Sequence, residues 1–238
     1  MHIDTASSRS ALPGASSGAD REVVAALLHC LDRPLVLVGM MGVGKTSLGR
    51  RLAALLGVPF VDADEEIEAA AQMTIPEIFA TYDEAYFRAG ERRVIARLMG
   101  NTGAESAPVS THIPASTHIP ASNRVKVIAT GGGAFCHAET REMILRDGIA
   151  IWLDAELDTL VERTARKANR PLLENGNRRE ILARLKADRE SLYAQAPIHV
   201  QSGNGPHQRV IGQVCHAILA WLDTPPSPAS TPEPTDKT

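Results

Sequence analysis

The segment Leu35-Val-Leu-Val-Gly-Met-Met-Gly-Val-Gly-Lys-Thr46 decides the fold. Its four opening apolar residues predict a short strand that is buried on both faces, as in a parallel sheet. Residues 39–46 then fit the pattern G-x-x-x-x-G-K-[S/T], and the residues after them have the spacing of an amphipathic helix. Strand, glycine-rich loop and helix in this order predict a loop that wraps the phosphates of a nucleoside triphosphate.

Each residue type in this loop has a physical reason to be there. Glycines let backbone N–H groups turn inward onto phosphate oxygens. We expect Lys45 to reach the β- and γ-phosphates and the Thr46 hydroxyl to hold Mg²⁺. A glycine-rich turn without a ligand is the alternative, which the flanking strand and helix disfavour. The nucleotide-binding candidates here are Gly42, Val43, Gly44, Lys45, Thr46 and Ser47.

Along the rest of the chain, short apolar runs alternate with stretches of helical spacing. Strands are expected at 35–38, 60–61, 125–129, 149–153 and 198–200, and helices at 46–56, 64–71, 83–99, 139–147, 157–164, 178–193 and 207–222. Thr74 and Glu77 form a capping box that opens one more helix. This alternation predicts an α/β fold: a three-layer α/β/α P-loop NTPase of the nucleoside-monophosphate-kinase type, with a five-stranded parallel sheet. Ligands in such sheets bind at the carboxyl ends of the strands.

Composition narrows the class of protein. The 238 residues are 44% hydrophobic and 22% charged, which excludes disorder of the whole chain. A net charge of −3 predicts no general attraction to nucleic acid or to an anionic membrane, and no apolar run is long enough to span a bilayer. Cys30, Cys136 and Cys215 fit neither a disulfide framework nor a zinc site, so we expect a cytoplasmic protein.

The loops after the second and third strands, and one helix between them, carry further polar groups. Asp62 and Asp64 follow the second strand, where one carboxylate can approach a metal and the other a second substrate; a helix cap is the alternative for Asp64. Arg88 and Glu91 share one helix face, which also suits a simple exposed ion pair. Three consecutive glycines, residues 131–133, permit close approach of a small ligand to the backbone.

Three arginines complete the set, and each taken singly is better explained as an ordinary charge on a solvated surface. Arg163 lies late in a helix, and Arg170 lies in a polar stretch that is typical of a lid over a phosphoryl group. Arg189 is a candidate guanidinium fork for a carboxylate.

Taken together, these features resemble the shikimate kinase family. The resemblance runs from about residue 35 to 222 and rests on the phosphate loop, Asp62-Ala-Asp64, Phe87-Arg88-x-x-Glu91, Gly131–Gly133, Arg170-Pro-Leu-Leu and Arg189-x-x-Leu-Tyr193. It implies transfer of the ATP γ-phosphoryl group to the 3-hydroxyl of shikimate, a step of aromatic amino acid biosynthesis, with Mg²⁺ as cofactor.

The resemblance also implies a role for each matching residue. Arg88 and Arg189 would clamp the carboxylate of shikimate, Asp64 would accept from its hydroxyls, and Glu91 would orient Arg88. The shikimate-binding set is Asp64, Arg88, Gly131, Gly132, Gly133 and Arg189; the catalytic set is Lys45, Asp64 and Arg170; the metal set is Thr46 and Asp62; and Arg163, Arg170 and Pro206 would contact the nucleotide.

Three departures from the family pattern and two alternatives remain, and one of the departures is that the loop insertion and both tails are extra. Ser191 stands where the family commonly has proline, and the segment 203–207 lacks an arginine sometimes found there, so contacts on the adenine side stay open. Another small-molecule kinase, of the gluconate or nucleoside-monophosphate type, would keep the same phosphate loop. A nucleotide-sensing protein without activity is the other alternative, which the retained Lys45, Asp64 and Arg170 disfavour.

We expect a single kinase domain over 20–223, with disordered tails over 1–19 and 224–238, a disordered loop insertion over about 100–123 and a lid over about 165–177. The insertion holds a tandem repeat, Ser-Thr-His-Ile-Pro-Ala at 110–115 and again at 116–121. Its two histidines suggest metal capture, but a duplication that lengthened a surface loop explains them better because neighbouring ligands are scarce. The few arginines of the first tail leave a transit peptide as an alternative to plain disorder. We expect a monomer.

Overall fold

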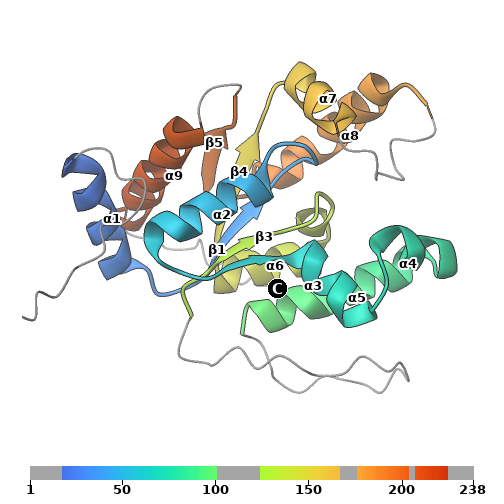
Figure 1. Ribbon diagram of the computed structural model, residues 1–238, viewed down its shortest axis with the longest axis horizontal. Coiled ribbons are helices and arrows are strands. Elements are labelled where there is room, and N and C mark those ends of the chain that lie inside the picture. Colours follow the sequence, from blue (N-terminus) through green and yellow to red (C-terminus); the bar gives the residue numbers. More distant parts are fainter. Residues whose placement is uncertain (1–17, 101–123, 167–175, 204–206, 225–238) are drawn as a thin grey trace, which may run out of the picture.

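The computed structural model describes residues 18–100, 124–166, 176–203 and 207–224. Within these ranges five strands form one parallel sheet in the order β2-β3-β1-β4-β5 (Figure 1). The strands are β1 (Leu35–Val38), β2 (Phe60–Asp62), β3 (Val127–Ala129), β4 (Ile149–Asp154) and β5 (Ile198–Gln201). The predicted five-stranded α/β fold is therefore confirmed.

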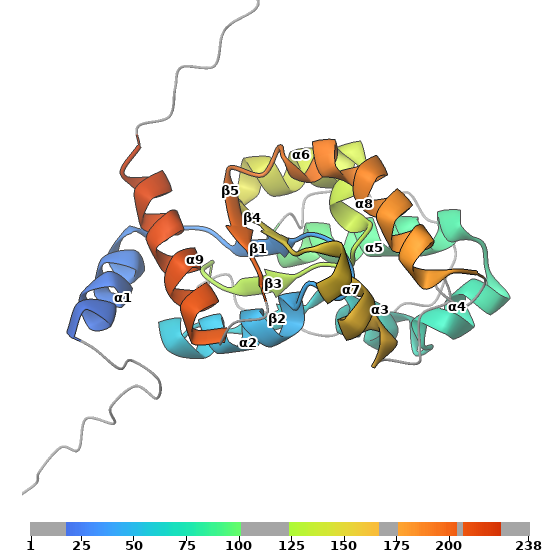
Figure 2. The same cartoon turned by 90° about the horizontal axis from the view of Figure 1, so that it is seen from above.

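Helices cover both faces of this sheet. The helices α2 and α9 lie on one face, and α5 and α6 lie on the other (Figure 2). The helices are α1 (Gly18–Cys30), α2 (Lys45–Leu56), α3 (Ala63–Ala71), α4 (Ile75–Thr81), α5 (Glu84–Leu98), α6 (Ala138–Asp147), α7 (Leu157–Ala165), α8 (Arg178–Tyr193) and α9 (His207–Leu222), with a 3₁₀ turn η1 (Ala134–Cys136). None of these described helices combines the length and apolar character that a membrane crossing needs.

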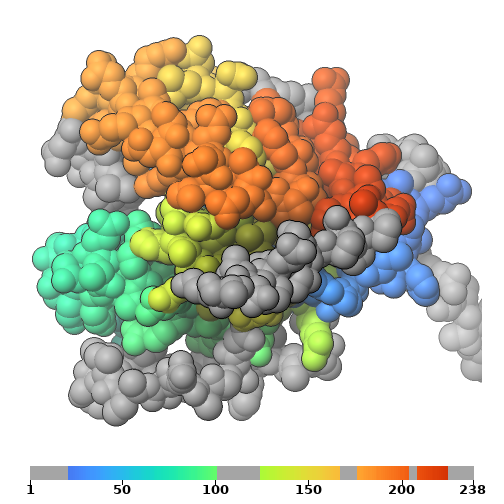
Figure 3. Space-filling view, turned by 180° about the vertical axis from the view of Figure 1, so that it is seen from behind, coloured from blue at the N-terminus to red at the C-terminus, as the bar shows by residue number. Residues whose placement is uncertain are grey.

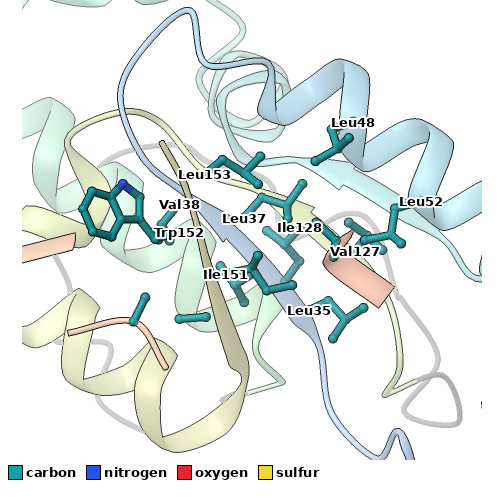
Figure 4. Packing of buried hydrophobic residues seen from close by; sticks show 14 of the residues in the cluster. Leu35, Leu37, Val38, Leu48, Leu52, Val127, Ile128, Ile151, Trp152 and Leu153 are labelled. Atoms are coloured by element: carbon teal, nitrogen blue, oxygen red, sulfur yellow. The ribbon is translucent and has the colours of Figure 1, made fainter. Parts of the chain in front are cut away.

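The core forms where β1 meets its neighbours. All four residues of β1 are fully buried, because strands lie on both sides and helices on both faces. Leu48 and Leu52 of α2 lie in the same cluster as Leu35 and Leu37 (Figure 4). Helix α2 ends at Leu56, and Gly57 caps it in a left-handed conformation with φ 65°.

Strand β3 begins two residues later than expected, at Val127 instead of Val125. Leu35 and Phe60, the first residues of the two neighbouring strands, both pair with Val127. No strand residue therefore remains to pair with Val125, and a strand is defined by its partners rather than by its own apolar side chains. The apolar run alone could not reveal where the neighbours begin.

Helix α1 packs on α9, beside the sheet (Figure 2). Val24, Leu27 and Leu31 supply the buried face, with Leu27 fully buried. The apolar spacing of residues 21–31 predicts a helix that packs somewhere on the protein but does not indicate its partner. The repeat and most of the predicted tails, loop insertion and lid lie outside the described residues, whereas Gly18 and Ala19, which were assigned to the first tail, belong to α1.

Candidate functional site

The phosphate-binding loop connects β1 to α2 at the carboxyl edge of the sheet. Gly39, Gly42 and Gly44 have φ angles of 131°, 84° and 103°, which disfavour any residue with a side chain. At Gly39 a Cβ atom would also lie 2.2 Å from the carbonyl oxygen of Leu153. Helix α2 starts at Lys45 without a side-chain cap, so its first N–H groups are available to an anion.

Lys45 folds back over this loop. Its Nζ donates to the carbonyl oxygens of Gly39, at 2.7 Å, and Met40, at 3.0 Å. The side chain is buried, with 8% exposed, so the ammonium group stays beside the loop rather than in bulk water. A phosphate oxygen arriving in the loop meets a cation already in place.

Thr46 and Asp62 lie in contact. The Thr46 hydroxyl donates to Asp62 Oδ2 at 2.7 Å, and Asp62 Oδ1 accepts from the backbone N–H of Asp64 at 3.1 Å. Asp62, not Asp64, thereby caps α3, so the alternative that Asp64 serves only as a helix cap is wrong.

The chemistry of this pair fits Mg²⁺. A hydroxyl and a carboxylate are hard oxygen donors, as Mg²⁺ prefers. No group of three or more His, Cys, Asp or Glu side chains within the described residues could hold a metal ion. Mg²⁺ in general is bound through one or two protein oxygen ligands together with substrate phosphates and water.

Asp64 lies in an acidic and partly buried surrounding. Burial, and then the negative charges of Asp62 and Glu91, raise the pKa of Asp64 to about 6, against the opposing attraction of Lys45. A Cβ atom on Gly131 would lie 2.8 Å from both Asp64 Oδ1 and Glu91 Oε1. The two carboxyl groups therefore meet at Gly131, where a side chain would displace them.

Arg88 and Glu91 form the predicted ion pair, with Arg88 Nη1 2.8 Å from Glu91 Oε2. The side chains are only 17% and 3% exposed, so an ordinary surface ion pair is wrong as an explanation. Glu84, on the outer side, accepts from Arg88 at 3.1 Å. A Cβ atom on Gly133 would lie 2.8 Å from the guanidinium group of Arg88. Arg88 therefore lies directly against residues 131–133, which we call the glycine loop.

Arg189 reaches the same loop from α8. Its Nη1 donates to the Gly132 carbonyl oxygen at 3.2 Å. The α8 segment lies against the segment that contains η1 and α6 (Figure 3). A Cβ atom on Gly132 would lie 3.2 Å from the backbone nitrogen of Met41, so the glycine loop also borders the phosphate-binding loop. The candidate residues for binding the acceptor and those for binding the nucleotide therefore lie at the same edge of the sheet.

Arg163 lies on the nucleotide side of this edge. It donates to the carbonyl oxygens of Val43, at 3.0 Å, and Gly203, at 2.9 Å. Ser202, which the sequence analysis did not single out, donates to the same Val43 oxygen at 2.9 Å. Only its place at the end of β5 could have indicated it. Arg170 and Pro206 lie outside the described residues.

Tyr193 is a second residue whose role the sequence analysis missed. Its hydroxyl donates to the Gly132 carbonyl oxygen, and the side chain is 1% exposed. In the sequence, Tyr193 was noted only as the last residue of the pattern Arg189-x-x-Leu-Tyr193. Its fixed spacing from Arg189 is the one feature of the sequence that could have indicated a role.

This chain is similar in sequence and in fold to known proteins. The family model "Shikimate kinase" matches residues 41–105 and 117–222. A curated shikimate kinase of Novosphingobium aromaticivorans is 62% identical over 192 residues, covering 81% of this chain and 90% of the relative, and one of Rhodopseudomonas palustris is 45% identical over 222 residues, covering 91% and 97%. The solved structure of shikimate kinase from Acinetobacter baumannii in complex with shikimate has a TM-score of 0.69 at 32% identity, covering 83% of this chain and 97% of the other.

Proposed function

Because this chain belongs to the shikimate kinase family, we propose a role in its two-substrate site for each residue gathered at the carboxyl edge of the sheet. The chain transfers the γ-phosphoryl group of ATP to the 3-hydroxyl of shikimate, giving shikimate 3-phosphate and ADP. One observation carries the residue assignment: Asp64, Arg88 and Arg189, from three separate helices, converge on the glycine loop that borders the phosphate-binding loop.

Arg88 and Arg189 bind the carboxylate of shikimate. Two guanidinium groups on one loop suit a small anion, since each offers a planar fork of N–H donors. Glu91 holds Arg88 in place through the 2.8 Å ion pair, and Glu91 itself is buried by the loop. The backbone of Gly131, Gly132 and Gly133 forms the floor under the ring, because side chains there would displace Asp64 or Arg88 or press on the phosphate-binding loop.

The phosphate-binding loop holds ATP. Backbone N–H groups of residues 42–47 and the ammonium group of Lys45 bind its phosphates, and Arg163 lies toward the adenine. Arg170 and Pro206, proposed from the sequence alone, act at the γ-phosphate and at the base. Lys45 and Arg170 neutralise the charge that develops as the phosphoryl group moves.

Thr46 and Asp62 would hold Mg²⁺, Asp62 through a water molecule. When bound, the ion would supply positive charge to the β- and γ-phosphates. The Thr46–Asp62 hydrogen bond keeps both oxygen donors at the mouth of the loop.

Asp64 orients the acceptor hydroxyl and takes its proton. A pKa of about 6 leaves the carboxyl group mostly ionised at neutral pH and still basic enough to share a proton. Phosphoryl transfer depends mainly on the positioning of the reactants and on charge neutralisation. Because Asp64 also positions the acceptor hydroxyl, its loss disturbs alignment as well as proton transfer. A monomeric state and a cytoplasmic location stay predictions.

Replacement of Arg88 tests the assignment. Arg88→Ala is expected to weaken shikimate binding about 10- to 100-fold, because a charge-assisted contact is lost, while ATP affinity stays within about twofold. Arg92→Ala is the matched control, since Arg92 lies on the same helix with its side chain 48% exposed and paired to exposed Glu139. Binding of each ligand is measured by calorimetry, and turnover by ADP release. Equal losses for both ligands, or no loss for shikimate, would contradict the acceptor assignment.

A panel of acceptors separates the alternative kinases. Shikimate, gluconate and AMP are compared at equal concentration in the ADP-release assay, with Arg88→Ala alongside. The proposal requires turnover with shikimate that depends on Arg88. ADP release that requires gluconate or AMP instead of shikimate would favour another small-molecule kinase, and no ADP release with any acceptor would favour a nucleotide-binding protein without activity.

A further inference from the structure

Tyr193 is the last residue of α8, and its side chain reaches the glycine loop of residues 131–133. None of the roles proposed above accounts for this contact. Its hydroxyl and the Arg189 guanidinium donate to the same carbonyl oxygen, that of Gly132. We propose that Tyr193 is a positioning residue for shikimate, which holds the glycine loop and Arg189 in the arrangement that receives the acceptor. This inference rests on the acceptor site proposed above.

The ring of Tyr193 is itself held in one position. It is 1% exposed and lies 6.1 Å, centroid to centroid, from the ring of Trp152 on β4. Trp152 in turn stacks on His199 of β5 at 4.0 Å. Because the ring is buried beside Trp152 of the sheet, packing in the core restricts where its hydroxyl can lie.

Gly132, whose carbonyl group accepts from Tyr193, lies between the two proposed substrate sites. The Gly132 backbone borders Met41 in the phosphate-binding loop, and the neighbouring glycines border Asp64 and Arg88. A rotation of the Gly132 peptide would therefore move the floor under shikimate relative to the phosphates. Transfer rates depend steeply on such alignment.

The hydroxyl is a donor throughout the working range of pH. Burial raises the pKa of Tyr193, so the proton stays on its oxygen, and a carbonyl oxygen can only accept. Removing the hydroxyl leaves the Gly132 oxygen with Arg189 as its side-chain donor. Arg189 would then satisfy the carbonyl at the expense of the carboxylate of shikimate.

The test is Tyr193→Phe in the full chain, which keeps the ring and removes one oxygen. We expect kcat/KM for shikimate to fall by about 5- to 20-fold, the effect of one lost hydrogen bond at a loop of the site, with KM for ATP within about twofold. Unchanged constants for both substrates would overturn the inference, and so would parallel losses for shikimate and ATP.

Ser202→Ala is the matched control. It removes an equivalent hydrogen bond from a buried hydroxyl to a carbonyl oxygen, but at Val43 on the nucleotide side. At saturating ATP, kcat/KM for shikimate is expected to stay within about twofold in this variant. An equal fall of kcat/KM for shikimate in both variants would mean that general loosening, not positioning, explains the effect of Tyr193→Phe.

A double-mutant cycle with Arg189→Lys tests whether Tyr193 acts on shikimate through Arg189 and the carbonyl oxygen that they share. Because Tyr193 and Arg189 share one carbonyl oxygen, the loss caused by Tyr193→Phe should shrink to less than about half in the Arg189→Lys background. Fully multiplicative losses would overturn the inference. Saturating ADP, for which the proposed site is the phosphate-binding loop, is expected to stabilise a weakly folded variant during purification and shikimate titration.

The outcome for this inference is separable from that for the proposed function. If Arg88→Ala weakens shikimate binding and Tyr193→Phe leaves kcat/KM for shikimate unchanged, the acceptor site stands and only the role of Tyr193 fails. If Arg88→Ala leaves shikimate binding intact, the acceptor site itself is wrong, whatever Tyr193→Phe does.

Discussion

Replacement of Asp64 by asparagine should stabilise the free enzyme while it removes activity. Burial and the charges of Asp62 and Glu91 raise the pKa of this carboxyl group to about 6, from its ordinary value of 3.8. In the folded state the group therefore keeps its proton at pH values where the unfolded chain has lost it. Stability from this group is full below about pH 4, falls as pH rises through about 6, and is flat above.

The magnitude follows from the two pKa values. Each tenfold change in the dissociation constant is worth about 1.4 kcal/mol, so the change from 3.8 to about 6 corresponds to about 3 kcal/mol. Asp64 is partly exposed, and solvent screening lowers this figure, so we expect about 2 kcal/mol. In Asp64→Asn no carboxyl group has to ionise in this buried, acidic surrounding. At pH 8 the unfolding free energy of the variant should therefore exceed that of the parent by about 2 kcal/mol.

The assay is urea unfolding of parent and variant between pH 4 and 8, without ligands. The difference in unfolding free energy should be near its smallest value at pH 4, grow through pH 6 and level off. Glu65→Gln is the control, because Glu65 is the next residue on α3 and pairs with Arg50 at the exposed surface. A difference between parent and Asp64→Asn that does not change with pH, or a variant less stable at pH 8, would refute the reasoning.

Three further outcomes are expected. Lys45→Ala should lower kcat by about 100-fold or more in the ADP-release assay, because its ammonium group lies at the phosphate-binding loop; near-normal turnover would reject that role. Gly133→Ala should raise KM for shikimate with little change in KM for ATP, since its methyl group would meet the Arg88 guanidinium 2.8 Å away; equal changes in both constants would contradict this. Leu27→Ala should lower the unfolding free energy by about 2–5 kcal/mol, because this fully buried side chain joins α1 to the core; a loss below about 1 kcal/mol in urea unfolding would mean that α1 is loosely attached.

Several features of the site could be predicted from the sequence because they depend on residues near one another in the chain. The phosphate-binding loop needs a buried strand, glycines and a helix start within about a dozen residues, and all are visible in residues 35–46. The capping box of Thr74 and Glu77 is equally local, and the structure confirms both of its hydrogen bonds. Helix α8 begins and ends at the predicted residues, 178 and 193.

Other features stayed ambiguous in the sequence because more than one partner was available. Asp62 and Asp64 could both cap a helix, and only the fold turned Asp62 toward Thr46 and left Asp64 at the glycine loop. From the sequence, the Arg88–Glu91 pair was also compatible with an exposed helix surface. In the structure the loop of residues 131–133 lies against both side chains and buries them.

By itself, the sequence determined the class of fold, the nucleotide loop and, through motifs spread along the chain, the family. The tertiary structure alone decided which carbonyl Tyr193 and Arg189 share, which strand pairing begins β3, and that α1 packs on α9. The physical reason is distance along the chain: Gly132 and Tyr193 are 61 residues apart, and their contact arises from the packing of α8 beside the sheet. Local patterns set backbone conformation, whereas contacts of this kind depend on how all the layers pack together.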